Sequence, residues 1–382
     1  MKAIGVLAFF IALLLSVMVH ELGHLLTAKK FGMKVSEFFL GFGKRIWSTK
    51  RGDTEYGIKA IPAGGYCRIQ GMDPDEVMEP GQEHRSFYKA SSGKKLIVLG
   101  AGSFNHFVLG FLLIFVLLSG VGVNALTPKI SDVVAGSAAA AAGFEKGDEV
   151  IAINGTPVKD WSKDAATIRN SKGATLTFLV KRGSQEITIS AAPKLTKISK
   201  SESRYLLGVM NEIGTKRLNP VTSVKASAAL TWDMTASSAK ALIQLPSKLP
   251  SLWGQTFSGQ ERASDGLVGV VGVARVSGQA ASSGTMNSSQ RIGTLILIVA
   301  SLNIFVGLFN LLPILPLDGG HMAIAIADEI RAFIARLRGR PRPAGIDVKV
   351  LTPITMVVFV LLAAMTVLLL IADIFNPISL NL

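Results

Sequence analysis

The chain has 382 residues, and 49% of them are hydrophobic, which is too apolar for an ordinary soluble protein. The apolar residues are concentrated in four runs: Leu7–Val19, Leu96–Val123, Leu295–Leu317 and Ile354–Ile371. The stretch between Thr127 and Gln290 is polar by comparison. Runs of this length predict four membrane spans around one large aqueous insert.

The net charge of +14 would suit a protein that binds nucleic acid, but the charge is placed to suit a membrane. One basic group lies between the first and second spans: Lys29, Lys30, Lys34, Lys44, Arg45, Lys50, Arg51, Lys94 and Lys95. The other lies between the third and fourth: Arg331, Arg336, Arg338, Arg340 and Arg342. The positive-inside rule places both groups in the cytoplasm and the insert outside. We therefore expect a multi-pass protein of the cell membrane, with anionic lipid rather than nucleic acid as the partner of these charges.

The N-terminus resembles a signal peptide, with Lys2 before the apolar stretch Ile4–Val19. No small-residue cleavage site closes that stretch, so we expect it to be retained as the first span. The single cysteine, Cys67, excludes an intramolecular disulfide and a zinc site built from thiolates.

Composition and turn signals divide the chain into eight segments. They are the first span (1–28), a cytoplasmic or membrane-reentrant region of β-hairpins (29–94), the second span (95–123), an α+β domain (124–200), an amphipathic helix with a linker (201–290), the third span (291–320), a basic cytoplasmic loop (321–351) and the fourth span (352–375). Within the linker, Pro220–Gln244 predicts an interfacial helix, and Pro246–Ser289 predicts mostly loop. The predicted fold class is a polytopic α-helical membrane protein of about four transmembrane helices, with a membrane-associated β-hairpin region and an inserted α+β domain.

The first span ends in His20-Glu21-Leu22-Gly23-His24. Histidines at positions i and i+4 share one face of a helix, so both can bind one zinc ion with the glutamate beside its open position. Zinc lowers the pKa of a bound water towards about 7, and Glu21 can then accept the proton. Polar groups inside an apolar span are costly and rarely present without a function.

Two histidines do not complete a zinc site, so a third ligand is required. The third span is interrupted by Pro313 and Pro316 just before Asp318, where an unpaired carboxylate would be costly and zinc would neutralise it. Two alternatives remain open: Asp318 could cap the following helix, or His321 could be the third ligand instead.

The paired motifs His20–His24 and Asn310–Gly320, in that order within two spans, resemble the signature of the site-2 protease family. The resemblance implies His20, His24 and Asp318 as zinc ligands, Glu21 as general base and Asn310 as a contact to the substrate backbone. It also implies a PDZ-like insert from Gly136–Ser137 and Ala142–Ile151. The implied substrate is a single-span membrane protein, such as an anti-sigma factor, already cut on its outer side.

The family commonly has Ala-Gly-Pro-x-x-Asn at the start of the second span, whereas this chain reads Ala101-Gly102-Ser103-Phe104-Asn105-His106. We expect Asn105 and His106 to pack rather than to react. For Asn310, an interhelical hydrogen bond is the alternative role. A non-proteolytic scaffold that uses the PDZ-like domain is the alternative function, and a transporter is disfavoured because the halves do not repeat. The sequence carries no signal for an oligomeric state.

Overall fold

A computed structural model of the chain describes residues 1–382 except 73–75, 198–202, 258–261, 263–266 and 378–382, and except the side chains of 348 and 349. The chain forms two compact units. One contains Met1–Val121 and Leu218–Leu382, and the other contains Gly122–Arg217.

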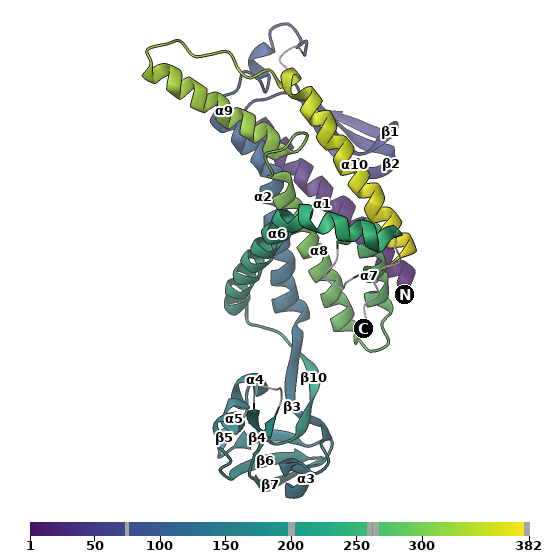
Figure 1. Cartoon of the computed structure of the whole chain (residues 1–382), viewed down its shortest axis with the longest axis vertical. Helices are drawn as coiled ribbons and strands as arrows, with labels where there is room; N and C mark the ends of the chain where they lie inside the picture. The colour runs from purple at the N-terminus through teal and green to yellow at the C-terminus, as the bar shows by residue number, and fades with distance from the viewer. Residues whose placement is uncertain (73–75, 198–202, 258–261, 263–266, 378–382) are drawn as a thin grey trace. The chain divides into compact units, whose positions relative to one another are not determined.

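In the described part of the chain, four helical stretches are long and apolar enough to cross a membrane. They are α1 (Lys2–Lys30), α2 (Ser92–Val116, continued by a π-helical turn to Val121), α8 (Ser288–Asn310) and α10 (Thr352–Phe375). Helix α2 packs against both α1 and α8 (Figure 1). Small residues allow the close approach, because a Cβ at Gly110 on α2 would lie 2.8 Å from Cγ1 of Ile304 on α8.

The β-hairpin region consists of two long antiparallel strands, β1 (Val35–Arg51) and β2 (Thr54–Ile69). We expected two short hairpins. Instead the strands bend so that the first half of β1 pairs with both halves of β2, and Phe39 lies opposite both Tyr66 and Gly57. The bend falls at Gly41 and Gly43, which have positive φ angles that larger residues rarely adopt.

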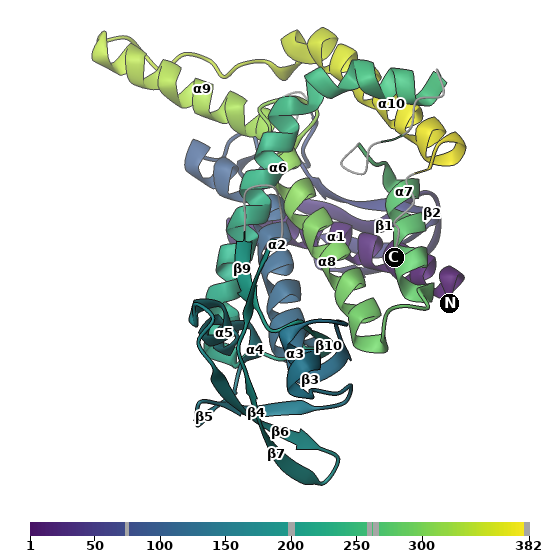
Figure 2. The same ribbon diagram turned by 60° about the horizontal axis from the view of Figure 1, so that its bottom comes forward.

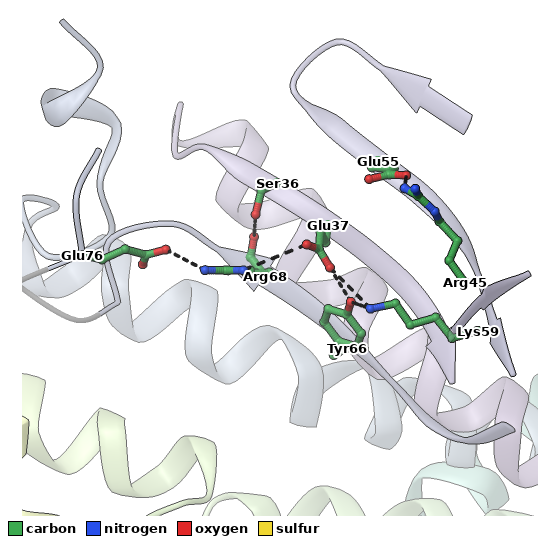
Figure 3. A network of polar contacts seen from close by, with 8 residues as sticks. All are labelled: Ser36, Glu37, Arg45, Glu55, Lys59, Tyr66, Arg68 and Glu76. Carbon is green, nitrogen blue, oxygen red and sulfur yellow. Dashed lines mark hydrogen bonds and ion pairs between the residues drawn. The ribbon is translucent and has the colours of Figure 1, made fainter. Parts of the chain in front are cut away.

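A polar network holds the bent strands together (Figure 3). Tyr66 donates a hydrogen bond to Glu37, and Lys59 and Arg68 lie 3.8 Å and 4.0 Å from the same carboxylate. Both halves of β2 are therefore tied to β1. The short helix η1 (Glu83–Arg85) follows the hairpin.

The linker between the inserted domain and the third span is more helical than we expected. Helix α6 (Pro220–Phe257) continues past Pro246 and Pro250, and α7 (Val270–Ser282) occupies the predicted loop. Helix α7 packs along α1 (Figure 2). Its glycines, serines and alanines indicated loop in the sequence, but in a membrane protein such residues also allow helices to pack closely.

The third span is shorter than we expected, because α8 ends at Asn310 and a separate helix, α9 (Asp318–Leu337), begins after the prolines. The predicted basic loop 321–351 is therefore helical as far as Leu337 and again in the short turn η3 (Val348–Leu351). We predicted a loop from the arginines of this segment, although its apolar residues Ile326, Ile330 and Phe333 recur at helical spacing.

The second unit has a sheet in the order β10-β3-β4-β6-β7, with β5 beside β4 and a separate β8–β9 pair. Its strands are β3 (Val123–Val133), β4 (Glu149–Ile153), β5 (Thr156–Pro157), β6 (Leu176–Arg182), β7 (Gln185–Ala191), β8 (Lys194–Lys197), β9 (Ser203–Leu206) and β10 (Val209–Lys216). Its helices are α3 (Ala138–Ala142), α4 (Trp161–Asp164) and α5 (Ala166–Asn170). Phe144, Trp161 and Phe178 lie in its buried core. We expected this domain to end at residue 200, but β10 pairs with β3 and extends it to Arg217.

Candidate metal centre

The two histidines of the first span lie one turn apart on α1 and point to the same side. Both are buried, and 3.1 Å separates Nε2 of His20 from Nε2 of His24. Helix α1 is continuous through this region, so the i, i+4 spacing of the histidines becomes a shared face. The pair is therefore arranged as the sequence predicted.

Asp318, the first residue of α9, completes a group of three potential ligands. Its Oδ2 lies 3.2 Å from Nε2 of His20 and 3.4 Å from Nε2 of His24. The chain returns sharply to this point because Gly319 and Gly320 have no side chains. A Cβ at Gly320 would lie 2.5 Å from the backbone nitrogen of Leu315.

The three atoms fit a zinc ion in both spacing and chemistry. Tetrahedral ligands about 2.0–2.1 Å from zinc lie about 3.3 Å apart, and the observed separations are 3.1, 3.2 and 3.4 Å. Nδ1 of His24 lies 2.8 Å from the carbonyl oxygen of Val98, so it carries the proton and leaves the lone pair on Nε2. A lone pair and a carboxylate oxygen at this separation require a cation or a proton between them.

Helix α2 covers the histidine pair closely. A Cβ at Gly102 would lie 2.5 Å from Cε1 of His20 and 2.6 Å from Nε2 of His24. Gly102 is therefore needed for the contact between α2 and this face of α1. Val98, one turn earlier on α2, supplies the carbonyl that accepts the hydrogen bond from His24.

Glu21 lies between the two histidines in sequence and is only partly buried. Its carboxylate interacts electrostatically with His20, His24 and Asp318 and accepts a hydrogen bond from the backbone of Cys67 on β2. Strand β2 of the hairpin therefore lies next to Glu21, beside the three potential metal ligands. Burial and the nearby Glu21 carboxylate raise the pKa of the Cys67 thiol to about 12, which keeps the thiol protonated and unreactive at neutral pH.

Sequence reasoning missed a buried polar network next to the histidines. Asn303 on α8 donates from Nδ2 to Ser16 on α1 (2.9 Å) and to the carbonyl of Val299 (2.8 Å). These two bonds fix the amide orientation, so Oδ1 of Asn303 accepts from Nδ1 of His106 at 2.8 Å. The rings of His106 and His20 lie 4.9 Å apart. The presence of Ser16 and Asn303 within apolar spans was the available signal.

The remaining candidates lie outside the group of three ligands. Among the described residues, His321 does not belong to a possible metal-binding group. Asn105 donates a hydrogen bond to the carbonyl of Val19 at 2.8 Å, so it joins α2 to α1. Asn310 is half-buried at the end of α8, and its side chain makes no hydrogen bond to another residue in the described part of the chain.

Comparison with known proteins agrees with this arrangement. The profile of Peptidase family M50 matches residues 8–352. The zinc metalloprotease Rip1 of Mycobacterium tuberculosis is 32% identical, over 98% of each of the two chains. The zinc metalloprotease Rip1 of Mycolicibacterium smegmatis is also 32% identical, over 99% of each.

The class of protein defined by these findings is a zinc metalloprotease with membrane-length helices. The chain belongs to Peptidase family M50, the site-2 protease family. The resemblance noted from the paired motifs is thereby confirmed, as are the enzyme class and the zinc cofactor. The non-proteolytic scaffold that we considered as an alternative is not supported.

Proposed function

We propose that this chain cleaves single-span membrane proteins within the bilayer, with zinc held by His20, His24 and Asp318. The observation that carries the proposal is the convergence of two imidazole nitrogens and one carboxylate oxygen within 3.4 Å of one another, in a buried place among membrane-length helices. Zinc, when bound, would supply the Lewis acidity that activates water for attack on a peptide bond.

Glu21 is the general base in this proposal. Its position next to both histidines lets the carboxylate take a proton from the attacking water and pass it to the leaving amine. Val98 and Gly102 act on the ligands, because the first orients His24 and the second allows α2 to close over the pair.

Asn310 is proposed to bind the substrate backbone. A helical substrate must unwind before its peptide bond can be attacked, and its freed N–H and C=O groups then need polar partners in an apolar setting. Asn310 suits this role because it ends α8 just before the turn to Asp318, and its amide has no other partner among the described residues.

The basic segments suggest that the catalytic end of α1 lies towards the cytoplasm and the inserted domain faces outward. We propose that the inserted domain is PDZ-like and either binds an extended segment by strand addition or excludes substrates that keep a bulky outer domain. An anti-sigma factor already cut on its outer side would be a suitable substrate.

The test is cleavage of a single-span model substrate by purified full-length protein in detergent, with bound zinc measured in each sample. Glu21→Gln should retain zinc and lose cleavage, whereas Glu83→Gln, an exposed glutamate, should keep both. Asp318→Asn and His24→Ala should lose zinc and activity together. Full cleavage by Glu21→Gln would exclude this base, and full zinc retention by Asp318→Asn would exclude this ligand.

A further inference from the structure

A groove of about 670 Å³ lies where the start of α2 meets the outer part of α9. This volume is in the range of small-molecule sites, about 300–1,000 Å³. Its lining includes Ser92, Leu96, Ile330, Phe333, Arg336 and Arg342. None of these residues belongs to the proposed zinc site, so the groove is a separate feature of the first unit.

One wall of the groove is apolar and exposed. Ile326, Ile330 and Phe333 are each about half exposed, with relative exposures of 45%, 53% and 56%. They recur at helical spacing and form a stripe along α9 that the described part of the chain covers only in part. A soluble protein rarely leaves such a stripe uncovered, but a helix at the surface of a membrane buries it among acyl chains.

The other part of the groove is basic. Arg336 makes no hydrogen bond or ion pair to another described residue. Arg342 is held at the rim by Glu329, whose carboxylate lies 3.0 Å from Nη2 of Arg342 and accepts a hydrogen bond from Ser92 at 2.8 Å. Glu329 also interacts electrostatically with Arg336, so it offsets one positive charge shared by the two arginines, and the groove keeps a net charge of +1 from Arg336, Arg342 and Glu329.

The segment that carries Arg342 folds back against α9 in a defined way. Asp328 on α9 accepts a hydrogen bond from the backbone N–H of Ile346 at 2.9 Å, and Arg331 donates to the carbonyl of Ala344 at 3.3 Å. These two bonds hold the chain against α9 just after Arg342. The groove is therefore formed by ordered contacts and not by a loose tail.

We propose that this groove binds one anionic phospholipid, with the phosphate at Arg336 and Arg342 and an acyl chain along Ile330 and Phe333. Charge complementarity favours an anionic headgroup, and the exposed apolar stripe favours a ligand that carries a hydrocarbon chain. A free phosphate would use the arginines and leave the stripe bare. Since α9 begins at Asp318, the bound lipid would hold the helix that carries a proposed zinc ligand.

The experiment uses delipidated full-length protein in detergent, titrated with phosphatidylglycerol or with phosphatidylcholine of the same chains, and followed by native mass spectrometry. Wild type should bind one phosphatidylglycerol at least about fivefold more tightly than phosphatidylcholine. Arg336→Gln should weaken phosphatidylglycerol binding about fivefold. The matched control is Arg338→Gln, which removes the same charge two residues away and outside the groove lining.

Phe333→Ser should weaken the binding of both lipids, and millimolar inorganic phosphate should fail to displace phosphatidylglycerol. Equal loss of binding in Arg336→Gln and Arg338→Gln would overturn the proposal, because it would show general charge attraction. Complete displacement by inorganic phosphate would identify a phosphate site instead. Both arginines are exposed, so neither substitution is expected to disturb folding, and retained zinc content in both variants verifies this.

Discussion

Gly102 on α2 and His24 on α1 are so close that a Cβ added to the glycine would lie 2.6 Å from Nε2 of the histidine. The same added atom would lie 2.5 Å from Cε1 of His20. The atom in conflict on His24 is the one that carries the lone pair for the metal. The packing of α2 on α1 and the geometry of the proposed zinc site therefore depend on one missing methyl group.

We predict that Gly102→Ala lowers both bound zinc and cleavage rate by at least about tenfold, because the methyl group must push one imidazole out of place. Gly100→Ala is the control on the same helix. Its added Cβ meets only the end of Met322, at an ordinary 3.8 Å, so zinc and activity should stay close to wild type. Equal zinc contents in the two variants, measured by elemental analysis, would contradict the prediction.

The turn before α9 should be equally sensitive. Gly320→Ala would place a Cβ 2.5 Å from the backbone nitrogen of Leu315, and backbone atoms cannot move aside as a flexible side chain can. We expect the start of α9, and with it Asp318, to shift, so that zinc affinity falls by at least about tenfold. Gly284→Ala, where no atom lies within 4 Å of the added group, should have no effect on zinc titration.

Much of the site could be predicted because its sequence signals are either local in the chain or polar residues whose burial in an apolar span costs free energy. The i, i+4 histidines define a helical face from sequence alone, and a carboxylate beside a helix break in an apolar span requires a partner. The contact between Gly102 and the histidines could not be predicted, because it depends on where α2 crosses α1. The same limit applies to Asn303 and Ser16, which meet only after α8 packs on α1.

Elements in the linker were misread for a different reason. Patterns that separate helix from loop come from soluble proteins, where Gly and Ser in α7 or Pro246 in α6 would disfavour a helix. In a membrane protein, small residues support packing and prolines are tolerated. Gly5 on α1 illustrates this, because its added Cβ would lie 2.6 Å from Cβ of Ala281 on α7.

Asn303→Leu should destabilise the protein by about 1–3 kcal/mol, because it leaves Nδ1 of His106 without its acceptor in a buried place. Ser16 would lose the bond from Asn303 and keep only the one that it donates to the carbonyl of Ala12. Zinc content should fall as well, since His106 packs beside His20. Thermal unfolding in detergent measures the first effect. Ser301→Ala, on the exposed side of the same helix, should change neither quantity, and an Asn303→Leu protein as stable as that control would refute the role of this network.

The inserted domain should lose stability at acid pH through Asp148. Burial alone would raise the pKa of its carboxyl, but hydrogen bonds from Arg182 and from the N–H of Glu145 lower the pKa below its usual range. Because the unfolded pKa is about 3.9, the ionised carboxylate stabilises the folded domain above that pH. This contribution is lost as the pH falls below about 4 towards the folded pKa.

Hydrogen exchange of β4 and β6 in the full-length protein can measure the effect. Wild type should lose protection between neutral pH and pH 3. Asp148→Asn should be about 2 kcal/mol less stable than wild type at neutral pH, and its protection should fall less between neutral pH and pH 3. Glu149→Gln, an exposed neighbour, should follow wild type. Identical pH profiles for Asp148→Asn and wild type would show that another group controls the acid response.

The last prediction concerns the attachment of α10, whose side chains are mostly exposed within the chain except near its end. There, Asp373 forms a buried ion pair with Arg262 at 2.8 Å and accepts a hydrogen bond from the N–H of Gly272 on α7 at 2.7 Å. Removing one partner leaves an uncompensated buried charge, so Asp373→Ala should cost about 3–5 kcal/mol of unfolding free energy.

The double variant Arg262→Met with Asp373→Leu should recover most of that loss, because it removes both charges and fills the space with apolar atoms. Asp233→Ala, at an exposed position of α6, is the control for the loss of one carboxylate and should leave thermal unfolding unchanged. If the double variant were as unstable as Asp373→Ala, the hydrogen bond from Gly272, and not the ion pair, would be the contact that holds α10 to α7. Thermal unfolding of the four proteins in one detergent therefore distinguishes the two contacts.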